Sequence, residues 1–293
     1  MISGFDHVVI AVRDLEAGTR AYETLLARPV SARFSIDGID SALIGLDNIA
    51  IELIAPGANG VGADRLRTAL EDGEGLKSIV FGARDLPGLH SRAARVGLAP
   101  EPINAREDYD VFRFATERTH GVRLMALERR IPAPRSSSVD ASVSGIDHIV
   151  VRTPDAERAA ALYGARLGLD MRLDREVAGR RLMFFRCGDA IMEIVHDPSL
   201  DNGRDNVWGL SWRVANADDA RARLAESGLN VSEVRTGLKP GTRLHRPRRH
   251  MRRVYAGDRA QLKTRLITRP CRRILSRCGA RNVSWIKKSR TGT

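Results

Sequence analysis

The feature that most constrains this chain is an internal repeat. The stretch GFDHVVIAVRDL, which starts at Gly4, returns as GIDHIVVRTPDA, which starts at Gly145. Sliding the sequence by 141 residues superposes these stretches and aligns Glu52 with Glu193 without a gap. A repeat of this length indicates that the chain is assembled from copies of one supersecondary unit.

Two fainter copies complete the pattern. GLKSIVFGARDL starts at Gly75, and GLSWRVANADDA starts at Gly209. The second of these keeps the glycine and places Asp219 opposite Asp14 of the first copy. The chain is therefore interpreted as four modules, which start near residues 4, 75, 145 and 209.

Each module has the same local order of elements. An apolar run of about eight residues, rich in Val and Ile, favours a strand. An Asp then stands at the N-cap of a segment with helical apolar spacing, as at Asp14, Asp155 and Asp219. Further strand-like runs follow, so one module consists of a strand, a helix and about three strands. This predicts an α+β fold of four βαβββ modules.

A Pro- and Ser-rich segment separates the second module from the third. It spans residues 131–143 and lacks apolar periodicity, which is typical of a linker. The modules are therefore expected to pair as sequence neighbours into a first domain over residues 1–130 and a second over 144–243.

The charge distribution divides the chain differently. The formal net charge is +12, yet residues 239–293 carry 18 Lys and Arg against the single acid Asp258. The preceding residues are therefore mildly acidic, and residues 244–293 form a basic tail.

The three cysteines form no CxxC pair, and no apolar stretch is long enough to span a membrane. A cytoplasmic protein without a membrane partner is therefore expected.

The basic tail begins before the fourth module has supplied its closing strands, so this module is expected to be incomplete. One interpretation is an arm that binds nucleic acid. The other is a shifted reading frame, because an out-of-frame GC-rich gene yields an Arg-rich, acid-poor translation. We favour the shift, since the break interrupts a module. The tail is then expected to be disordered, and nucleic acid is not an expected partner.

A histidine and a glutamate recur together in the repeat. His7 shares its strand face with Val9 and Ala11, while Glu52 lies within the apolar run IAIELIAP. A lone pair of this kind is usually structural, with the carboxylate paired or exposed. Its return as His148 and Glu193, again 45 residues apart, favours a chemical role. Imidazole and carboxylate are ligands suited to Zn²⁺, Fe²⁺, Mn²⁺ or Ni²⁺.

With four βαβββ modules, histidines on first strands and glutamates on last strands, the chain resembles the vicinal oxygen chelate superfamily. This is the group of glyoxalase I, fosfomycin and bleomycin resistance proteins and extradiol dioxygenases. The resemblance covers about residues 4 to 243. It implies that two modules close an open, cup-like barrel in which a divalent metal ion binds two oxygens of a substrate. The matching ligand positions are His7, Glu52, His148 and Glu193.

The other two modules lack matching ligands. Ser78 and Trp212 stand at the first-strand position, and Leu124 or Met125 stands where the second module would need an acid. Each cup then has two clear ligands, whereas such sites usually have three or four. A surface role is favoured over ligation for the two other candidates, His120 and His196. A less favoured arrangement, in which modules one and three face each other, would bring all four ligands into one site.

Three further features are interpreted as structural. Tyr22 and Tyr163 have helical spacing typical of core residues. Cys187 lacks a basic neighbour that would lower its pKa and is not expected to be a nucleophile. The stretch PGANGVG, from Pro56, lacks a P-loop ending and is interpreted as a connecting loop.

The resemblance leads to three functional hypotheses. The first is a metal-dependent glyoxalase-like lyase or isomerase that acts on a small oxygenated metabolite, with Glu52 as ligand and proton shuttle. The second is a metal-free small-molecule binding or resistance protein that uses the same cup. The third is an extradiol dioxygenase, ranked last because Ser78 and Trp212 replace the histidines that it would need. A homodimer is compatible with each.

Overall fold

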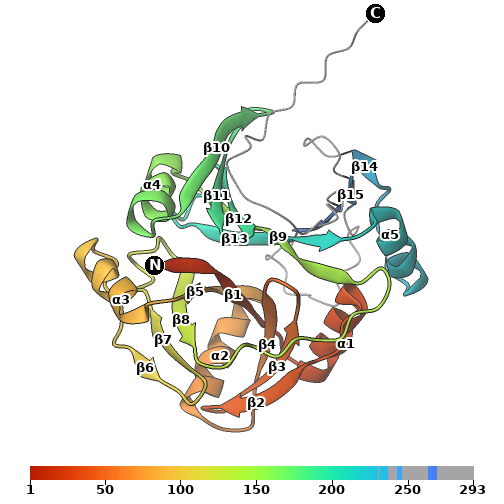
Figure 1. Ribbon diagram of the computed structural model, residues 1–293, viewed down its shortest axis with the longest axis horizontal. Coiled ribbons are helices and arrows are strands. Elements are labelled where there is room, and N and C mark those ends of the chain that lie inside the picture. Colours follow the sequence, from red (N-terminus) through yellow and green to blue (C-terminus); the bar gives the residue numbers. More distant parts are fainter. Residues whose placement is uncertain (230, 237–242, 246–262, 269–293) are drawn as a thin grey trace, which may run out of the picture.

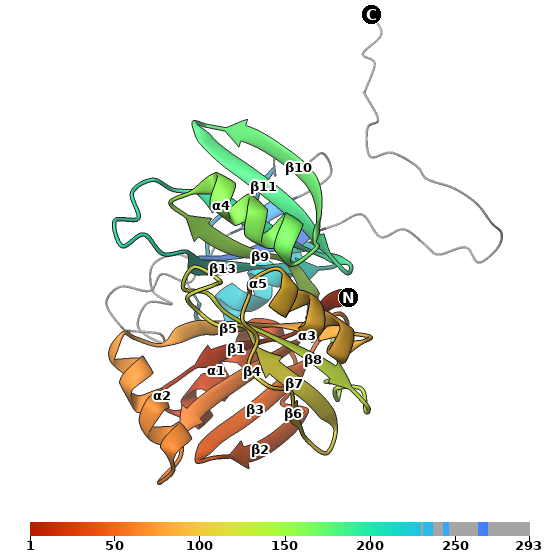
Figure 2. The same ribbon diagram turned by 90° about the vertical axis from the view of Figure 1, so that its left-hand side faces the viewer.

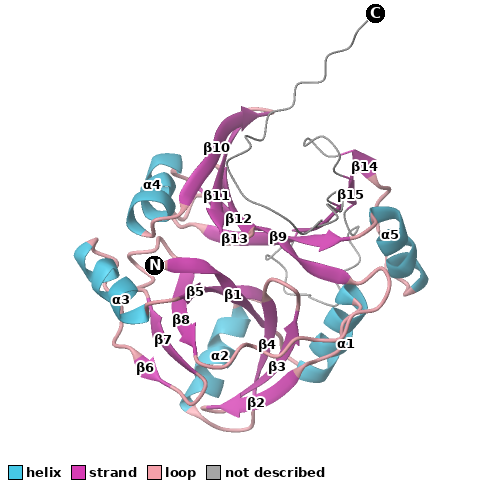
Figure 3. Ribbon diagram, in the orientation of Figure 1, coloured by secondary structure: helices cyan, strands magenta, loops and turns pink. Residues whose placement is uncertain are grey.

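The computed structural model describes residues 1–229, 231–236, 243–245 and 263–268. They form two eight-stranded sheets with helices on their flanks, which confirms the α+β class (Figure 1, Figure 3). Among these residues, no helix is long and apolar enough to cross a membrane.

The first sheet contains the first two modules. Its strands follow the order β2-β3-β4-β1-β5-β8-β7-β6. The elements are β1 (Ile2–Ala11), α1 (Leu15–Leu26), β2 (Ala32–Ile36), β3 (Ile39–Gly45), β4 (Ala50–Pro56), α2 (Val61–Glu71), β5 (Gly75–Ala83), α3 (Leu86–Arg95), β6 (Asn104–Ala105), β7 (Tyr109–Arg113) and β8 (Arg123–Arg129).

The second sheet repeats this order as β10-β11-β12-β9-β13-β16-β15-β14. The elements are β9 (Val143–Thr153), α4 (Ala156–Ala160), the π-helix η1 (Ala161–Arg166), β10 (Asp170–Val177), β11 (Arg180–Cys187), β12 (Ala190–His196), β13 (Asn206–Val214), α5 (Ala217–Glu226), β14 (Arg235–Thr236), β15 (Arg243–His245) and β16 (Lys263–Thr268).

Each sheet is built from modules that are neighbours in sequence. The central strands β1 and β5 pair antiparallel, as do β9 and β13. The arrangement in which modules one and three share a cup is therefore wrong, and the four predicted ligands are divided between two sheets.

Capping explains where most of the helices begin. Asp14, Asp85 and Asp155 each accept a hydrogen bond from a backbone N–H of the first helical turn. Such a cap contributes about 1 kcal/mol. The prediction of Asp219 as the fourth cap is wrong, because Asn216 caps α5 and Asp219 lies in its first turn.

This correction shifts the alignment of the fourth module by three residues. With Asn216 opposite Asp14, the residue opposite His7 becomes Gly209, not Trp212. Strand pairing agrees, since Gly209 lies opposite Val150 just as Ser78 lies opposite Val9. Bulges in β13 hid this register from a gapless alignment.

Parts of the predicted tail lie within the second sheet. Residues 243–245 pair with β16, and β16 pairs parallel with β13, as β8 does with β5 in the first sheet. Strand pairing therefore continues beyond residue 243, where the sequence placed the end of the domain. The other residues of the tail, and the prediction that they are disordered, lie outside the described residues.

The two sheets pack through their convex faces. One apolar core joins residues of both sheets, among them Val8 and Ile10 of β1 with Ile149 and Trp212. Figures 1 and 2 show the two sheets stacked with β1 and β5 beside β9 and β13. Because the convex faces meet, the concave faces of the two cups point away from each other.

An unpredicted helix, α2, covers one end of the first cup. The interpretation of PGANGVG as a connecting loop is wrong at its end, because the helix begins at Val61 and includes Gly62. Its Leu66 and Leu70 pack against Ala11 of β1, with Ile54 of β4 beside them. The other end of the concave face carries the predicted ligands.

Candidate functional site

The structure brings His7 and Glu52 together on the concave face of the first sheet. They lie on the parallel neighbours β1 and β4, where Val9 is opposite Glu52. His7 Nε2 is 3.1 Å from Glu52 Oε2. Both side chains are largely buried, with exposed fractions of 10% and 16%. The register of β1 and β4 therefore places both groups on one face of the sheet.

A second layer of polar residues holds this pair. Asp6 Oδ1 lies 2.7 Å from His7 Nδ1. Arg129 of β8 donates two hydrogen bonds of 2.7 Å to the Asp6 carboxylate, and its guanidinium carbon lies 5.5 Å from the ring centre of Tyr109. Ser41 of β3 donates to Glu52 Oε1 at 3.0 Å. Each partner restricts the orientation of the histidine or the carboxylate.

The electrostatics of the cluster follow from these contacts. Burial alone would lower the pKa of His7, but hydrogen bonds and charge interactions with Asp6 and Glu52 outweigh it and raise the pKa to about 9. Burial would raise the pKa of Asp6, but His7 and Arg129 lower it to about 2. The pKa of Glu52 is also lowered, despite burial, by His7 and Ser41. Near neutral pH, an imidazolium therefore lies between two carboxylates.

The donor set fits two positions of a metal site. A carboxylate on one ring nitrogen is the usual partner of a metal-ligating histidine, and Asp6 occupies that place on Nδ1. Two atoms that are each about 2.1 Å from one ion lie roughly 3.0–3.4 Å apart, which the 3.1 Å separation of Nε2 and Oε2 matches. In the described part of the chain, no cluster of three or more His, Cys, Asp or Glu could complete the site.

The second sheet repeats the histidine but not its environment. His148 Nδ1 lies 2.8 Å from Asp147 Oδ2, although the two do not meet hydrogen-bond geometry, and its ring meets the edge of Phe184 at 5.9 Å. When the two copies of the repeat are aligned at 141 residues, Leu182 stands at the position of Ser41, so the hydroxyl donor is absent from the second sheet. Within the described residues no hydrogen bond or ion pair joins His148 to Glu193, which is buried on β12.

The remaining candidates lie apart from the first cup's pair. His120 sits in a turn at a φ of 57°, with its carbonyl bonded to the backbone of Asp205. His196 Nε2 lies 3.3 Å from the Pro154 carbonyl. Met125 shares the concave face with Val80, so it, and not Leu124, is the counterpart of Glu52.

The residues interpreted as structural are buried. Tyr22 and Tyr163 have exposed fractions of 1% and 0%, in agreement with core packing. Cys187 is buried on β11, and burial raises the pKa of its thiol, which opposes a nucleophilic role.

Sequence reasoning missed four residues of the site. Asp6 carried a usable signal, because it precedes the histidine in both copies of the repeat. Ser41, Tyr109 and Arg129 carried none, because the first is not repeated and the other two belong to a module without the His–Glu pattern.

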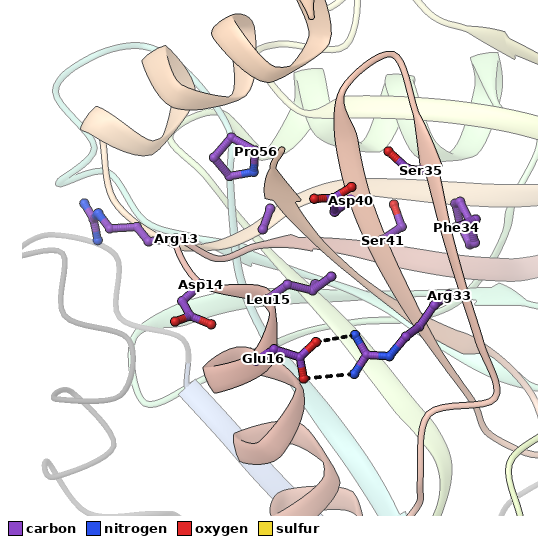
Figure 4. Close-up of a pocket in the computed structure, with 11 residues that line it drawn as sticks. Arg13, Asp14, Leu15, Glu16, Arg33, Phe34, Ser35, Asp40, Ser41 and Pro56 are labelled. Atoms are coloured by element: carbon purple, nitrogen blue, oxygen red, sulfur yellow. Dashed lines mark hydrogen bonds and ion pairs between the residues drawn. The ribbon is translucent and has the colours of Figure 1, made fainter. Parts of the chain in front are cut away.

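A separate cavity of about 640 Å³ opens between the start of α1 and the β2–β3 hairpin (Figure 4). Two of its charged groups pair with each other, since Arg33 forms an ion pair with Glu16 at 2.7 Å, and Asp14 caps α1. The cavity shares only Ser41 with the His7–Glu52 cluster. The concave face, and not this cavity, is therefore the candidate site.

Comparison with known proteins agrees with the fold. A family model described as glyoxalase-like domain matches residues 5–133. A second, described as the glyoxalase/bleomycin resistance protein/dioxygenase superfamily, matches residues 147–244. This chain belongs to the vicinal oxygen chelate superfamily. No curated protein matches it significantly.

Solved structures of this superfamily share the architecture at low identity. A mutant of 4-hydroxymandelate synthase from Streptomyces coelicolor is 14% identical, with a TM-score of 0.69 over 93% of this chain and 94% of that one. The Mn(II)-bound glyoxalase from Novosphingobium aromaticivorans is 15% identical, with a TM-score of 0.64 over 91% and 82%. A halotolerant catechol dioxygenase is 13% identical, with a TM-score of 0.62 over 92% and 87%. At these identities the likeness concerns the fold alone.

Proposed function

We propose that this protein is a metal-dependent glyoxalase-like lyase or isomerase, and that its first cup binds a divalent ion, Zn, Ni, Mn or Fe, through His7 and Glu52. The observation that carries the proposal is the 3.1 Å approach of His7 Nε2 to Glu52 Oε2, with Asp6 on the other ring nitrogen. A glyoxalase with the same fold is Mn(II)-bound. We also propose that His148 and Glu193 form a weaker site, because the Ser41 donor is absent there.

Each residue of the cluster would have its own chemical role. A bound ion supplies Lewis acidity for two vicinal oxygens of a small metabolite. Asp6 holds the imidazole with Nε2 directed at Glu52, and Ser41 holds one oxygen of the Glu52 carboxylate. Glu52 is ionised near neutral pH and can therefore accept a proton from a carbon next to a carbonyl, although its lowered pKa makes it a weaker base.

Metal binding by the full chain tests the proposal. With only two protein ligands, the site is expected to bind the ion weakly. The measurement is a calorimetric titration with Mn²⁺ after the metal has been removed by chelator and dialysis. His7→Ala and Glu52→Gln should each weaken binding by about tenfold or more. His148→Ala is the matched control and should leave the stronger site unchanged. Tight binding that survives His7→Ala would refute the assignment.

A metal-free binding protein is the second candidate, and one observation favours it. His7 and Glu52 already satisfy each other as an ion pair, and the described residues offer no third ligand. This candidate predicts the same ligand affinity with and without chelator. A dioxygenase ranks below both, because Ser78 and Gly209 stand at the first-strand positions of the second and fourth modules.

A further inference from the structure

Arg129 offers one hydrogen-bonding nitrogen to the first cup. Its Nε and Nη2 both donate to Asp6, and the side chain is 19% exposed. Nη1 has no hydrogen-bond partner among the described residues, nor is it among the fully buried unpaired atoms. A guanidinium fixed by two bonds and stacked on a ring loses little further entropy when its last nitrogen binds an anion.

Tyr109 supplies a second donor beside Arg129 on the same face of the sheet. It lies directly opposite Arg129 on the paired strands β7 and β8 and packs beside Leu127 on the concave face. Its hydroxyl has no hydrogen-bond partner among the described residues. Burial and the charge of Glu52 raise the pKa of Tyr109, so this hydroxyl keeps its proton.

These donors adjoin the metal-binding pair on one side and an apolar surface on the other. Asp6 Oδ1 lies 2.7 Å from both His7 Nδ1 and Arg129 Nη2, so one carboxylate oxygen links the guanidinium to the imidazole. The apolar surface consists of the partly exposed Val111 and Met125, which pack against the buried Val9, Val80 and Leu127.

The second sheet provides an internal contrast. There, Arg213 takes the role of Arg129 by binding Asp147 through Nε. Its Nη1 and Nη2 are both bonded to Asp189, so no nitrogen of this arginine remains to bind a ligand. Of the two arginines that bind the aspartate beside the histidine, Arg129 and Arg213, only Arg129 therefore keeps a nitrogen without a partner among the described residues.

We propose that Arg129 Nη1 and Tyr109 Oη bind the carboxylate of the substrate, so that the first cup takes a small aliphatic α-hydroxy or α-oxo carboxylic acid. This rests on the proposed function, which supplies the neighbouring site for vicinal oxygens. A carboxylate matches the two donors, and an oxygen on the adjacent carbon would face the His7–Glu52 pair. The alkyl part would cover the apolar surface.

The test compares two probes on the full chain after chelator treatment, by calorimetry. The probes are hydroxyisocaproate and its methyl ester, which keep the same alkyl body but differ in charge. The acid should bind about tenfold more tightly than the ester, as expected for a charge-assisted hydrogen-bonded pair. Tyr109→Phe, which keeps the ring and the Asp6–Arg129 pair, should weaken acid binding about three- to tenfold and leave the ester unchanged.

Arg129→Met should abolish the preference for the acid, whereas Arg213→Met in the second sheet should keep it. Absence of acid binding, equal binding of acid and ester, or a preference that survives both Tyr109→Phe and Arg129→Met would overturn the carboxylate site. Metal binding that still depends on His7 would then leave the proposed function standing. Loss of His7-dependent metal binding with an intact acid preference would refute the proposed function instead.

Discussion

At the scale of residues, the repeated glycine and the repeated histidine serve different parts of the molecule. A Cβ on Gly145 would come 2.2 Å from Asn48 Oδ1, and the Asn48 amide bonds both the N–H and the carbonyl of Ile146. A Cβ on Gly4 would lie 3.5 Å from Gly188. In each copy the glycine allows a turn of the other domain to approach, while the histidine three residues later faces the cup.

The difference between the two glycines predicts different stability effects. Gly145→Ala should lower the free energy of unfolding by about 1–3 kcal/mol, because its methyl group displaces the Asn48 amide. Gly4→Ala is the matched control, since 3.5 Å is an ordinary contact distance, and should cost less than about 1 kcal/mol. Denaturant unfolding measures both, and equal losses would contradict this account of the domain junction.

The raised pKa of His7 predicts a pH dependence of stability. The folded-state pKa of about 9 exceeds the ordinary 6.5, so the stabilisation is complete below about pH 6.5 and is lost as pH rises through 9. The full contribution of this shift is about 3 kcal/mol. In chelator-treated protein, His7→Ala should flatten the stability curve across this window. His148→Ala is the control for the loss of a histidine outside the cluster. If the free energy of unfolding depends on pH in the same way in His7→Ala as in the unchanged protein, the ion-pair cluster is contradicted.

At the scale of elements, the two domains share the βαβββ module but differ in the helices and contacts that are added to it. Arg92 of α3 donates to the carbonyl of Ala165, at the end of η1, and Arg223 of α5 donates to the carbonyls of Thr24 and Leu25, at the end of α1. These two contacts join each domain to a helix of the other. The helix α2, by contrast, belongs to the first cup alone.

The packing of α2 predicts a local effect on the first cup. Leu70 is 5% exposed and contacts Ala11, so Leu70→Ala should weaken the attachment of α2 by about 2–4 kcal/mol. Hydrogen exchange of the α2 amides should then accelerate while exchange in β9 stays unchanged. Arg65→Ala, on the exposed side of α2, is the matched control. Uniform acceleration across both domains would show that α2 does not open separately.

At the scale of the whole molecule, the back-to-back packing gives two cups that open away from each other, so each must assemble its site from its own residues. The family-model match of the second domain ends at residue 244, where the basic segment begins. Strand β16 nevertheless occupies the place of a last strand beside β13. The stretch KTRLIT has only two apolar residues, which are adjacent, so its pairing as a strand depends largely on the neighbouring strands.

The break at residue 244 predicts a feature of the gene. If the basic segment results from a shifted reading frame, another frame downstream of the codons for Gly241 to Leu244 should encode alternating apolar strands with a Gly-rich turn. Resequencing this region and translating all frames provides the measurement. If no frame restores such strands, the shift hypothesis is wrong and the basic segment requires a function of its own.

The sequence by itself determined the βαβββ module and the recurrence of His7 and Glu52 on apolar strands, because these depend on short-range periodicity and on an internal repeat. It failed where bulges changed the register, as at Trp212 and Asp219. The sequence favoured pairing between neighbouring modules, but only the tertiary structure decided against a shared cup of modules one and three, since any two βαβββ units present similar edges. The tertiary structure also brought Arg129 and Tyr109 to His7, because the curvature of the sheet joins strands more than 100 residues apart. Such contacts leave no local pattern in the sequence.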